Sequence, residues 1–427
     1  MEQWCIQLAA GVKLLSVHTD KFKTGLFSVT LTVPLRKETA TANALIADVL
    51  YRGSRKHPDI SSLSAAADDL YGAALEVGVR QRGETQCICL QCSFIDDLYA
   101  LDGMAILEPA IGLVGEVLLD PLMEGEVFCR DYVESEADNL ADRIRSRIND
   151  KTGWSVFRLL SEMCAGEAFG LDKLGDAKEA LLLTPGQLWD RYRQLLNDAG
   201  VIFYYNGSAP AERVEQAVRS AFGPLLTDRY APDCCDVISE PPGEVRRIID
   251  SMDVSQGKIA MGFRTGGITM RDPRYPALLV CNTLYGGSGT SKLFLNVRER
   301  LELCYFASSM LDKLKGVLIV ISGVECSDFA IAEAEMLSQL DAVRAGDFTE
   351  EELNAAIRAV VSGLVSRKDS QSQMEDDAVT GIIGLGAAMD QDVLIRAVEQ
   401  VTARQVVEVA RCIRLDMVYR LTGKETV

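Results

Sequence analysis

Histidine is scarce in this chain: His18 and His57 are the only two among 427 residues. A zinc site built on one helical turn needs two imidazoles a few residues apart, and a hydrolytic site adds a carboxylate between them as general base. His18 and His57 lie too far apart in sequence to share a turn, so we expect no catalytic metal and no cofactor. A Ser-His-Asp or Cys-His arrangement is not expected either. His18 falls in a β-like stretch, and His57 in a polar turn beside Pro58, where a histidine is usually solvated.

The bulk composition limits the classes of function. A chain of 427 residues exceeds what one hydrophobic core usually supports, so at least two domains are predicted. The formal net charge of −18 argues against nucleic-acid binding, because phosphate backbones require a basic face. The acidic balance favours basic partners or substrates, or is simply a solvated acidic surface.

Several features indicate a cytoplasmic protein without membrane spans. The longest apolar run, around residues 317–321, is far shorter than the roughly 20 residues that cross a bilayer. The first residues carry no basic group before their short apolar patch, unlike a signal peptide. The twelve cysteines lack the spacing of a disulfide framework. Cys87 and Cys89 share one face of a predicted strand, where buried thiols are more common than a metal site.

The chain contains an internal repeat. The segment Leu-Tyr-Arg-Gly-Ser at 50–54 matches Leu-Tyr-Gly-Gly-Ser at 284–288 without a gap. Apolar residues alternate at 27–35 and again at 259–263, which predicts a half-buried strand before each matching segment. In the first half an amphipathic helix follows the strand, with one buried face formed by Ala42, Leu45, Ile46, Val49 and Leu50.

The later parts of the two halves also correspond. Capping-box residues at 184–187 and 402–405 each predict a helix start, and a strand follows at 201–206 and at 417–421. Long helices are predicted before them, over 126–148 and 349–366, the second with its own capping box.

Proline and glycine are dense at 228–244, which is typical of a linker. The sequence therefore predicts an N-terminal lobe at 1–227, a linker at 228–244 and a C-terminal lobe at 245–427. The fold class is α+β, with two homologous lobes, each a mainly antiparallel sheet with helices packed on one face. We expect a clamshell with a cavity between the lobes, although duplication could also produce an inert two-domain body.

The first repeat resembles the zinc helix of the pitrilysin/insulinase-like peptidases, or inverzincins, and of the mitochondrial processing peptidase subunits. Members of this family typically read His-Phe-Leu-Glu-His-x-x-Phe-x-Gly-Thr at this helix. Here Ala44 and Ala47 replace the first histidine and the glutamate, and Asp48 replaces the second histidine. One carboxylate cannot hold zinc, so the motif is degenerate. The third family ligand, a glutamate on a later helix, is left open among Glu126, Glu134 and Glu136.

The second repeat resembles the family more closely. Its signature, Gly-x-x-Ser-x-Leu-(Phe/Tyr)-x-x-(Leu/Val)-Arg-Glu-x-x-Gly-Leu-x-Tyr, resembles the segment 287–305 and is matched position by position from Ser291 to Tyr305, except that Glu302 stands where the family has glycine, which we expect to change the turn. Gly287 lies one position further from Ser291 than the glycine of the signature. The resemblance implies that Arg298 and Tyr305 contact bound peptide, and it adds Gly287 and Ser288 to the predicted substrate-binding residues. The alternative is an Arg298–Glu299 surface pair and a core tyrosine. The glycine-rich segment 286–292 does not have the spacing of a phosphate-binding loop.

The resemblance implies a non-catalytic peptidase homologue. Some family members are split into two chains, of which one carries the zinc motif and the other supplies the arginine and tyrosine. The chain resembles the second kind, and in particular the zinc-less bacterial homologues associated with 5-aminopentanol modification of elongation factor P. We therefore predict a heterodimer with a zinc-bearing peptidase homologue and contact with a peptide substrate. The alternative is a non-enzymatic scaffold or peptide-binding protein that self-associates as a homodimer.

Overall fold

The computed structural model describes residues 2–101, 103–229, 236–241 and 243–423. Its α+β composition confirms the predicted fold class. In the described residues no helix is both long enough and apolar enough to span a membrane. The chain forms two compact units, and each is described by itself below. The clamshell arrangement of the two lobes stays a prediction.

The first unit contains a six-stranded sheet in the order β1-β2-β8-β3-β5-β4. All neighbouring strands are antiparallel except β2 and β8. Side chains alternate along β3, so that Phe27, Val29 and Leu31 join the core on the face covered by α3 and α8. The elements of this unit are β1 (Glu2–Ala9), β2 (Val12–His18), β3 (Thr24–Pro34), β4 (Ala74–Arg82), β5 (Thr85–Ile95), β6 (Met123–Glu124), β7 (Val127–Phe128), β8 (Gly200–Gly207), α1 (Lys37–Leu50), α2 (Ile60–Asp68), α3 (Leu107–Leu119), α4 (Arg130–Ser146), α6 (Ala177–Ala180), α7 (Pro185–Asp198), α8 (Ala211–Ala221) and α12 (Gln371–Leu385).

The second unit contains a five-stranded sheet in the order β11-β12-β10-β13-β9. Only β13 and β9 are parallel. The elements of this unit are β9 (Arg246–Met252), β10 (Gly257–Arg264), β11 (Cys304–Asp312), β12 (Val317–Val324), β13 (Arg414–Gly423), α5 (Lys151–Met163), α9 (Tyr275–Asn282), α10 (Phe329–Ala345), α11 (Glu350–Arg367), α13 (Gln391–Glu399) and α14 (Ala403–Cys412).

The two sheets share one topology, as the internal repeat predicts. The order β4-β5-β3-β8-β2 in the first unit corresponds, strand for strand, to β11-β12-β10-β13-β9 in the second. The single parallel pair also falls at the same place, β2 with β8 and β9 with β13. Among the described residues, β1 is the one strand of the first sheet that has no counterpart in the second.

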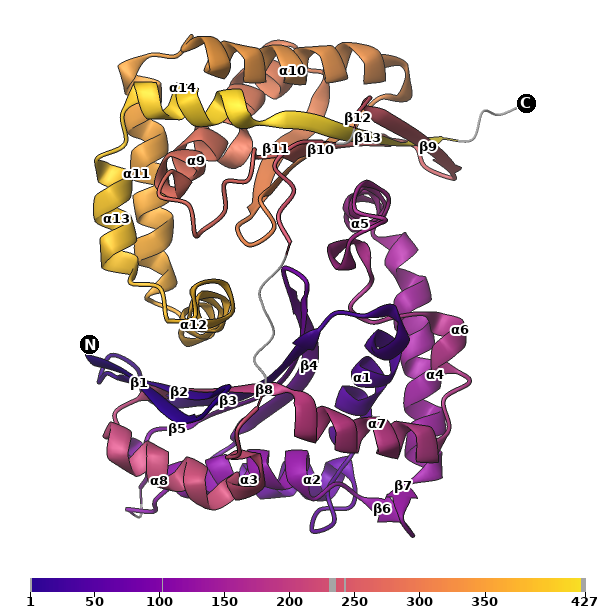
Figure 1. The fold of residues 1–427 in the computed structure, drawn as a ribbon, viewed down its shortest axis with the longest axis vertical. Helices are drawn as coiled ribbons and strands as arrows, with labels where there is room; N and C mark the ends of the chain where they lie inside the picture. Colours follow the sequence, from indigo (N-terminus) through magenta and orange to yellow (C-terminus); the bar gives the residue numbers. More distant parts are fainter. Residues whose placement is uncertain (1, 102, 230–235, 242, 424–427) are drawn as a thin grey trace. The chain divides into compact units, whose positions relative to one another are not determined.

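Each unit takes one helix from the other half of the chain. The helix α12 packs on β3 and β8 of the first sheet, on the face opposite α3 and α8 (Figure 1). In the same way, α5 packs on β10 and β13 of the second sheet, opposite α10 and α14. The helices therefore do not all lie on one face of each sheet. The predicted boundary at 228–244 describes the repeat along the chain, whereas the compact units exchange residues 146–170 and 370–389. Residues 230–235 and 242 of this linker lie outside the described residues.

The predicted helix starts are confirmed where a side chain caps the backbone of the first turn. Capping boxes are present at Thr184 with Gln187, and at 349–352 and 402–405. The predicted long helix over 126–148 begins later, at Arg130. Glu126 instead lies in the turn between β6 and β7, after Gly125 with a left-handed φ of +68°. A tight hairpin therefore replaces the first turn of that predicted helix.

Candidate functional site

The degenerate zinc motif lies on the buried helix α1. Ala44 and Ala47 are 0% and 1% exposed, and their methyl groups belong to the core of the first unit. Asp48 is the one member of the motif that carries an ionisable group. Because alanine has no donor atom, these positions contribute a single carboxylate toward any metal.

The carboxylate of Asp48 forms an ion pair with an arginine. Its two carboxylate oxygens accept hydrogen bonds from the two terminal nitrogens of Arg143 on α4, at 3.2 and 2.7 Å. Burial raises the pKa of Asp48, Arg143 lowers it, and the nearby Glu136 raises it, with a net rise above the ordinary value. Two parallel hydrogen bonds from one guanidinium thus hold the Asp48 carboxylate, which stands at the position of the second histidine in the motif.

The three candidate third ligands have different surroundings. Glu126 is exposed in the β6–β7 turn, and Glu134 is exposed and lies 3.5 Å from Arg130. Glu136 is buried and accepts from Arg52 at 2.8 Å, so it is the candidate that lies near Asp48. Across the part of the chain that the structure describes, no three His, Cys, Asp or Glu side chains are grouped to hold a metal ion.

His57 is more enclosed than its sequence context predicts. Its Nδ1 lies 2.7 Å from Oε1 of Glu116, its side chain is 16% exposed, and its backbone N–H donates to the Ser54 hydroxyl. Ser54 donates to the same carboxylate oxygen of Glu116. The hydroxyl therefore bonds to the carboxylate rather than to the imidazole, which is not the order of a catalytic triad. The expectation of a solvated histidine is wrong because α3 brings Glu116 beneath this turn.

Gly53 of the repeated motif is required by this turn. Its φ is +154°, and an added Cβ would lie 2.6 Å from the carbonyl oxygen of His57. The motif glycine thus serves the backbone of the turn that follows α1, even though the metal ligands have been lost.

The second-lobe motif begins in two π-helical segments, Thr283–Gly287 and Leu293–Arg300. Such wide turns are rare and occur often at functional sites. Arg298 lies in the second segment, with its guanidinium carbon 4.7 Å from the centre of the Phe294 ring and its Nε 3.6 Å from Glu299. The predicted Arg298–Glu299 proximity is therefore present, but the arginine side chain keeps 41% of its surface exposed.

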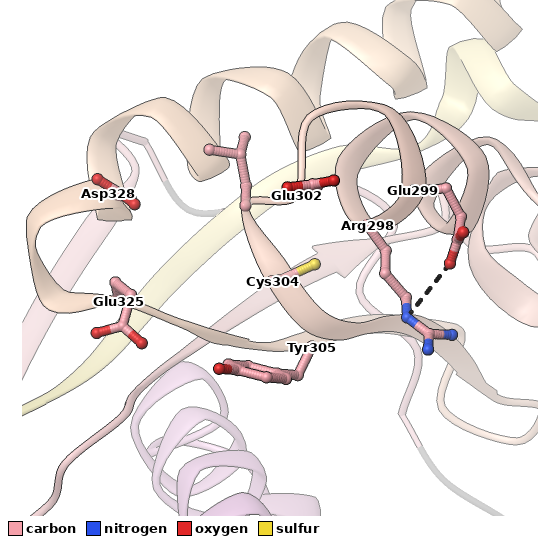
Figure 2. Close-up of a pocket in the computed structure, with 9 residues that line it drawn as sticks. Arg298, Glu299, Glu302, Cys304, Tyr305, Glu325 and Asp328 are labelled. Atoms are coloured by element: carbon pink, nitrogen blue, oxygen red, sulfur yellow. Dashed lines mark ion pairs between the residues drawn. The ribbon is translucent and has the colours of Figure 1, made fainter.

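Arg298 and Tyr305 line the same pocket, which has a volume of about 440 Å³. Tyr305 is the second residue of β11 and is 73% exposed, so it is not a core tyrosine. Figure 2 shows Arg298 and Glu299 on one side of the pocket and Glu325 and Asp328 on the other. The pocket thus combines one guanidinium, one phenol and several carboxylates, and it can offer both donors and acceptors to a polar ligand.

Glu302 keeps a backbone conformation that favours glycine. Its φ is +51°, in the left-handed region, where a side chain costs on the order of 1 kcal/mol. The predicted change of this turn relative to the family stays a prediction. The departure from the family signature lies in the added carboxylate, which lines the pocket.

The other two predicted substrate-binding residues lie apart from this pocket. Gly287 ends the first π-helix, and the Ser288 hydroxyl donates to the carbonyl oxygen of Thr283 at 3.2 Å. Neither lines the pocket of Arg298 and Tyr305. Lys292, at the end of the glycine-rich segment, is buried and pairs with Glu352 at 3.1 Å, which agrees with the rejection of a phosphate loop.

Sequence reasoning missed the residues that approach from distant segments. Glu325 and Asp328 come from the turn between β12 and α10, outside the recognised motif, and no local signal pointed to them. Arg143 could have been found only by placing α4 against α1. The strand thiols Cys87 and Cys89 are buried as expected, and burial raises the pKa of each to about 12, so they are not reactive thiolates.

Comparison with known proteins gives a consistent group of relatives. A family model described as the peptidase M16 inactive domain matches residues 183–360. The "probable inactive metalloprotease YmfF" of Bacillus subtilis is 31% identical over 415 residues, which cover 97% of this chain and 96% of the relative. An uncharacterized zinc protease of Mycobacterium tuberculosis is 26% identical over 305 residues, covering 71% of this chain and 68% of that protein.

Solved structures share the fold. A conserved protein from Enterococcus faecalis superposes with a TM-score of 0.91 at 22% identity, with both chains covered completely. A structure described as a peptidase M16 inactive domain from Pseudomonas fluorescens gives a TM-score of 0.78 at 16% identity, covering 99% of this chain and 98% of that one. At these identities the likeness concerns the fold alone.

Proposed function

The chain belongs to the M16 peptidase family, and we propose that it is the non-catalytic partner subunit of a zinc-bearing peptidase. In this role it completes the chamber of the active subunit and contacts the peptide substrate. The whole chain aligns with a relative that is itself named a probable inactive metalloprotease, and the chain is an inactive homologue that does not catalyse proteolysis alone. The proposal adds the partner and the substrate contact.

One observation carries the proposal: Arg298 and Tyr305 line one open pocket while the zinc positions of α1 are lost. A structural role would predict burial of both side chains, yet both are solvent-accessible. The guanidinium offers several N–H donors in a planar fork, and the phenol can donate one hydrogen bond. Together they can bind a peptide carbonyl or stabilise a developing oxyanion in a reaction whose metal is supplied by the other subunit.

The ion pair between Asp48 of α1 and Arg143 of α4 also supports a subunit that does not bind zinc. Arg143 satisfies Asp48 with two charged hydrogen bonds, so the carboxylate has a partner without a metal ion. Restoring a metal would require displacing this arginine as well as adding ligands. We further propose that the protein acts in the cytoplasm, since all cysteines in the described residues are free thiols, as is usual in a reducing compartment.

The test is co-expression with a zinc-bearing M16 homologue from the same genome. The two chains should co-elute and show peptidase activity that neither has alone. In the complex, Tyr305→Phe should lower turnover by about 10²–10³, the usual effect of losing one oxyanion donor. Arg298→Ala should also weaken substrate binding, because it removes a charged fork. Neither change should lower the melting temperature, since both side chains are exposed.

Matched variants at residues that do not line the pocket control for this experiment. Tyr99→Phe alters a phenol that is 42% exposed, and Arg404→Ala removes an exposed guanidinium paired within its own helix. Both should leave turnover unchanged. If the candidate partner is fully active by itself and never co-elutes, the non-enzymatic scaffold becomes the better account. Unchanged turnover in the two pocket variants of an active complex would instead remove the proposed substrate contact.

A further inference from the structure

The strand β1 forms an edge of the first sheet with few of the usual protections against pairing. It pairs with β2 on one side, and no strand among the described residues pairs with its other side (Figure 1). From Gln3 to Ala9 it contains no charged residue and no proline. Edge strands are normally blunted by charges, proline or bulges, because their free N–H and C=O groups otherwise pair with another chain. The single irregularity in its pairing lies at the hairpin end, between Gln7 and Ala9.

Two of the three other edges of the large sheets carry more charge than β1, whereas the edge strand β11 is charged only at its last residue, Asp312. The edge strand β9 carries Arg246, Arg247 and Asp250, and β4 carries Arg80 and Arg82. Moreover, β1 is the strand that the repeat does not duplicate, since β9 occupies the edge position equivalent to β2. The strand β1 therefore extends the first sheet beyond the strand order that the two units share, and it is uncharged from Gln3 to Ala9.

The sequence of β1 is nearly self-complementary. It reads Gln-Trp-Cys-Ile-Gln from residue 3 to residue 7. When two such strands run antiparallel with Cys5 opposite Cys5, Gln3 faces Gln7 and Trp4 faces Ile6, and each of these contacts occurs twice. Amide pairs and aromatic–β-branched pairs are favourable cross-strand neighbours. In this register Glu2 lies at the end of the strand pair, opposite Leu8, whereas a register centred on Trp4 would bring Glu2 nearer the centre, opposite Ile6.

We propose that β1 pairs with β1 of a second copy of this chain, around a two-fold axis at Cys5. With the axis perpendicular to the sheet, the face of Trp4 and Ile6 continues across the junction, and so does the exposed face of Cys5. Two six-stranded sheets then become one continuous sheet. This surface belongs to the first unit and does not involve the pocket of Arg298 and Tyr305, so the inference does not depend on the proposed function.

Geometry provides a direct probe of the register. Opposite residues in an antiparallel pair have Cα atoms about 4.5 or 5.5 Å apart. Both separations fall within the range that a disulfide spans, about 4.4–6.8 Å. Cys5 is exposed, so its thiol is accessible to a mild oxidant. Copper–phenanthroline would remove two electrons and two protons from the two Cys5 thiols and leave a covalent dimer.

The experiment uses the purified full-length chain. Sedimentation velocity should show a monomer–dimer equilibrium that depends on concentration, because a strand pair is a small interface. Oxidation should produce a dimer linked through Cys5, as identified by mass spectrometry. Cys5→Ser should abolish the crosslink and keep the equilibrium. Cys5→Lys places two like charges opposite each other and should weaken dimerisation by about tenfold or more.

Two controls make the result specific. Ile249→Lys adds the same charge to the edge strand β9, where Ile249 is 63% exposed, and should not affect dimerisation. Cys326→Ser removes another exposed thiol and should not affect the crosslink. The proposal is overturned if the chain is monomeric at every concentration, if Cys5→Lys dimerises like the wild type, or if the crosslink forms through another cysteine. Unchanged melting temperatures would show that the substitutions leave the fold intact.

Discussion

The exchanged helices α5 and α12 occupy equivalent places in the repeat but meet their sheets differently. Asp150 caps α5 and Ser370 caps α12, and five residues after these caps stand Ser155 and Glu375. Both are 0% exposed. Ser155 donates to the carbonyl of Lys151 in its own helix at 2.8 Å. The carboxylate of Glu375 instead reaches the first sheet, where it accepts from Ser28 on β3 at 3.1 Å and from Arg80 on β4 at 2.6 Å.

This difference shows that equivalent helices in the same topology can be attached to their sheets by different kinds of interaction. In the second unit, Leu159 and Met163 of α5 pack against apolar residues of the sheet such as Ile319 and Met417. In the first unit, α12 adds bonds that depend on direction, including those of Gln371 with Asn206 and with Thr24. Apolar contact depends mainly on the area buried, whereas hydrogen bonds and ion pairs depend on register and charge. The two helices should therefore respond to different substitutions.

The largest loss of stability is expected at Glu167, which follows α5 in the exchanged segment 146–170 and pairs with two buried cations. Glu167 accepts from Arg264 and lies 2.6 Å from both Arg264 and Lys315, whose side chains are 1% and 0% exposed. Glu167→Gln removes an anion that two buried cations share, although Asp416 still pairs with Arg264, and should reduce the free energy of unfolding by about 3–5 kcal/mol. Urea denaturation monitored by circular dichroism measures this loss of unfolding free energy.

The same residue gives a pH dependence. Burial alone would raise the pKa of Glu167, but hydrogen bonds and charge from Arg264 and Lys315 outweigh it, so the pKa lies below its ordinary value of 4.5. The ion pair therefore stabilises fully above that pH, and its contribution is lost as the pH falls through the folded-state pKa. The difference between wild type and Glu167→Gln should shrink in acid. A difference that grows below pH 4.5 would contradict this account.

Leu159→Ala tests the apolar attachment of α5. The side chain is 0% exposed, and its removal leaves a cavity, so unfolding should become easier by about 2–5 kcal/mol. Added salt should not change this loss, because no charge is involved. Leu182→Ala is the control, since Leu182 is 77% exposed and its truncation should have little effect. A loss as small as that of the control would mean that α5 is not held by its apolar face.

Glu375→Gln tests the polar attachment of α12. The substitution keeps the shape of the side chain but removes its charge beside Arg80. Because Arg80 is 34% exposed and can turn to water, we expect a loss of about 1–3 kcal/mol, smaller than at Glu167. Hydrogen exchange should report faster opening of α12 while α5 remains protected. Equal changes in the two helices would argue against independent attachment.

Ser155→Ala should have the smallest effect and completes the comparison with Glu375. Its hydroxyl bonds within α5, and alanine favours helix more than serine does, so the net change should be within about 0.5 kcal/mol. The melting temperature should therefore be close to that of the wild type. A loss similar to that of Glu375→Gln would mean that Ser155 has a role across the interface that its local hydrogen bond does not explain.

The sequence predicted what depends on short-range pattern. The capping box of Thr184 and Gln187, the helix ending at Leu50 and the repeat of the sheet elements are local or periodic signals, and they were read correctly. The loss of zinc ligands followed from the residue types at Ala44 and Ala47 alone. Arg298 and Tyr305 were brought to one pocket because a single short motif carries both.

What the sequence did not predict depends on packing between distant segments. The sequence of α5 or α12 contains no local signal for their exchange, because an amphipathic helix does not specify which sheet it covers. The pairing of Asp48 with Arg143 joins two helices across the first unit, and His57 meets Glu116 in the same way. The left-handed φ of Glu302 contradicts the usual preference for glycine, so the residue type gives no sign of this backbone angle.

The exchange of helices also constrains the order in which the chain can fold during synthesis. All strands of the first sheet have been made by Gly207, but α12 follows only after residues 235–369. At the usual rates of translation this interval lasts on the order of 10 seconds. Throughout it, the face that α12 will cover meets water, and that face carries the polar side chains of Ser28, Thr30 and Asn206 beside Ile202 and Tyr204. The polar side chains can be hydrated during this interval, which limits the apolar surface through which the unfinished unit could aggregate on the ribosome.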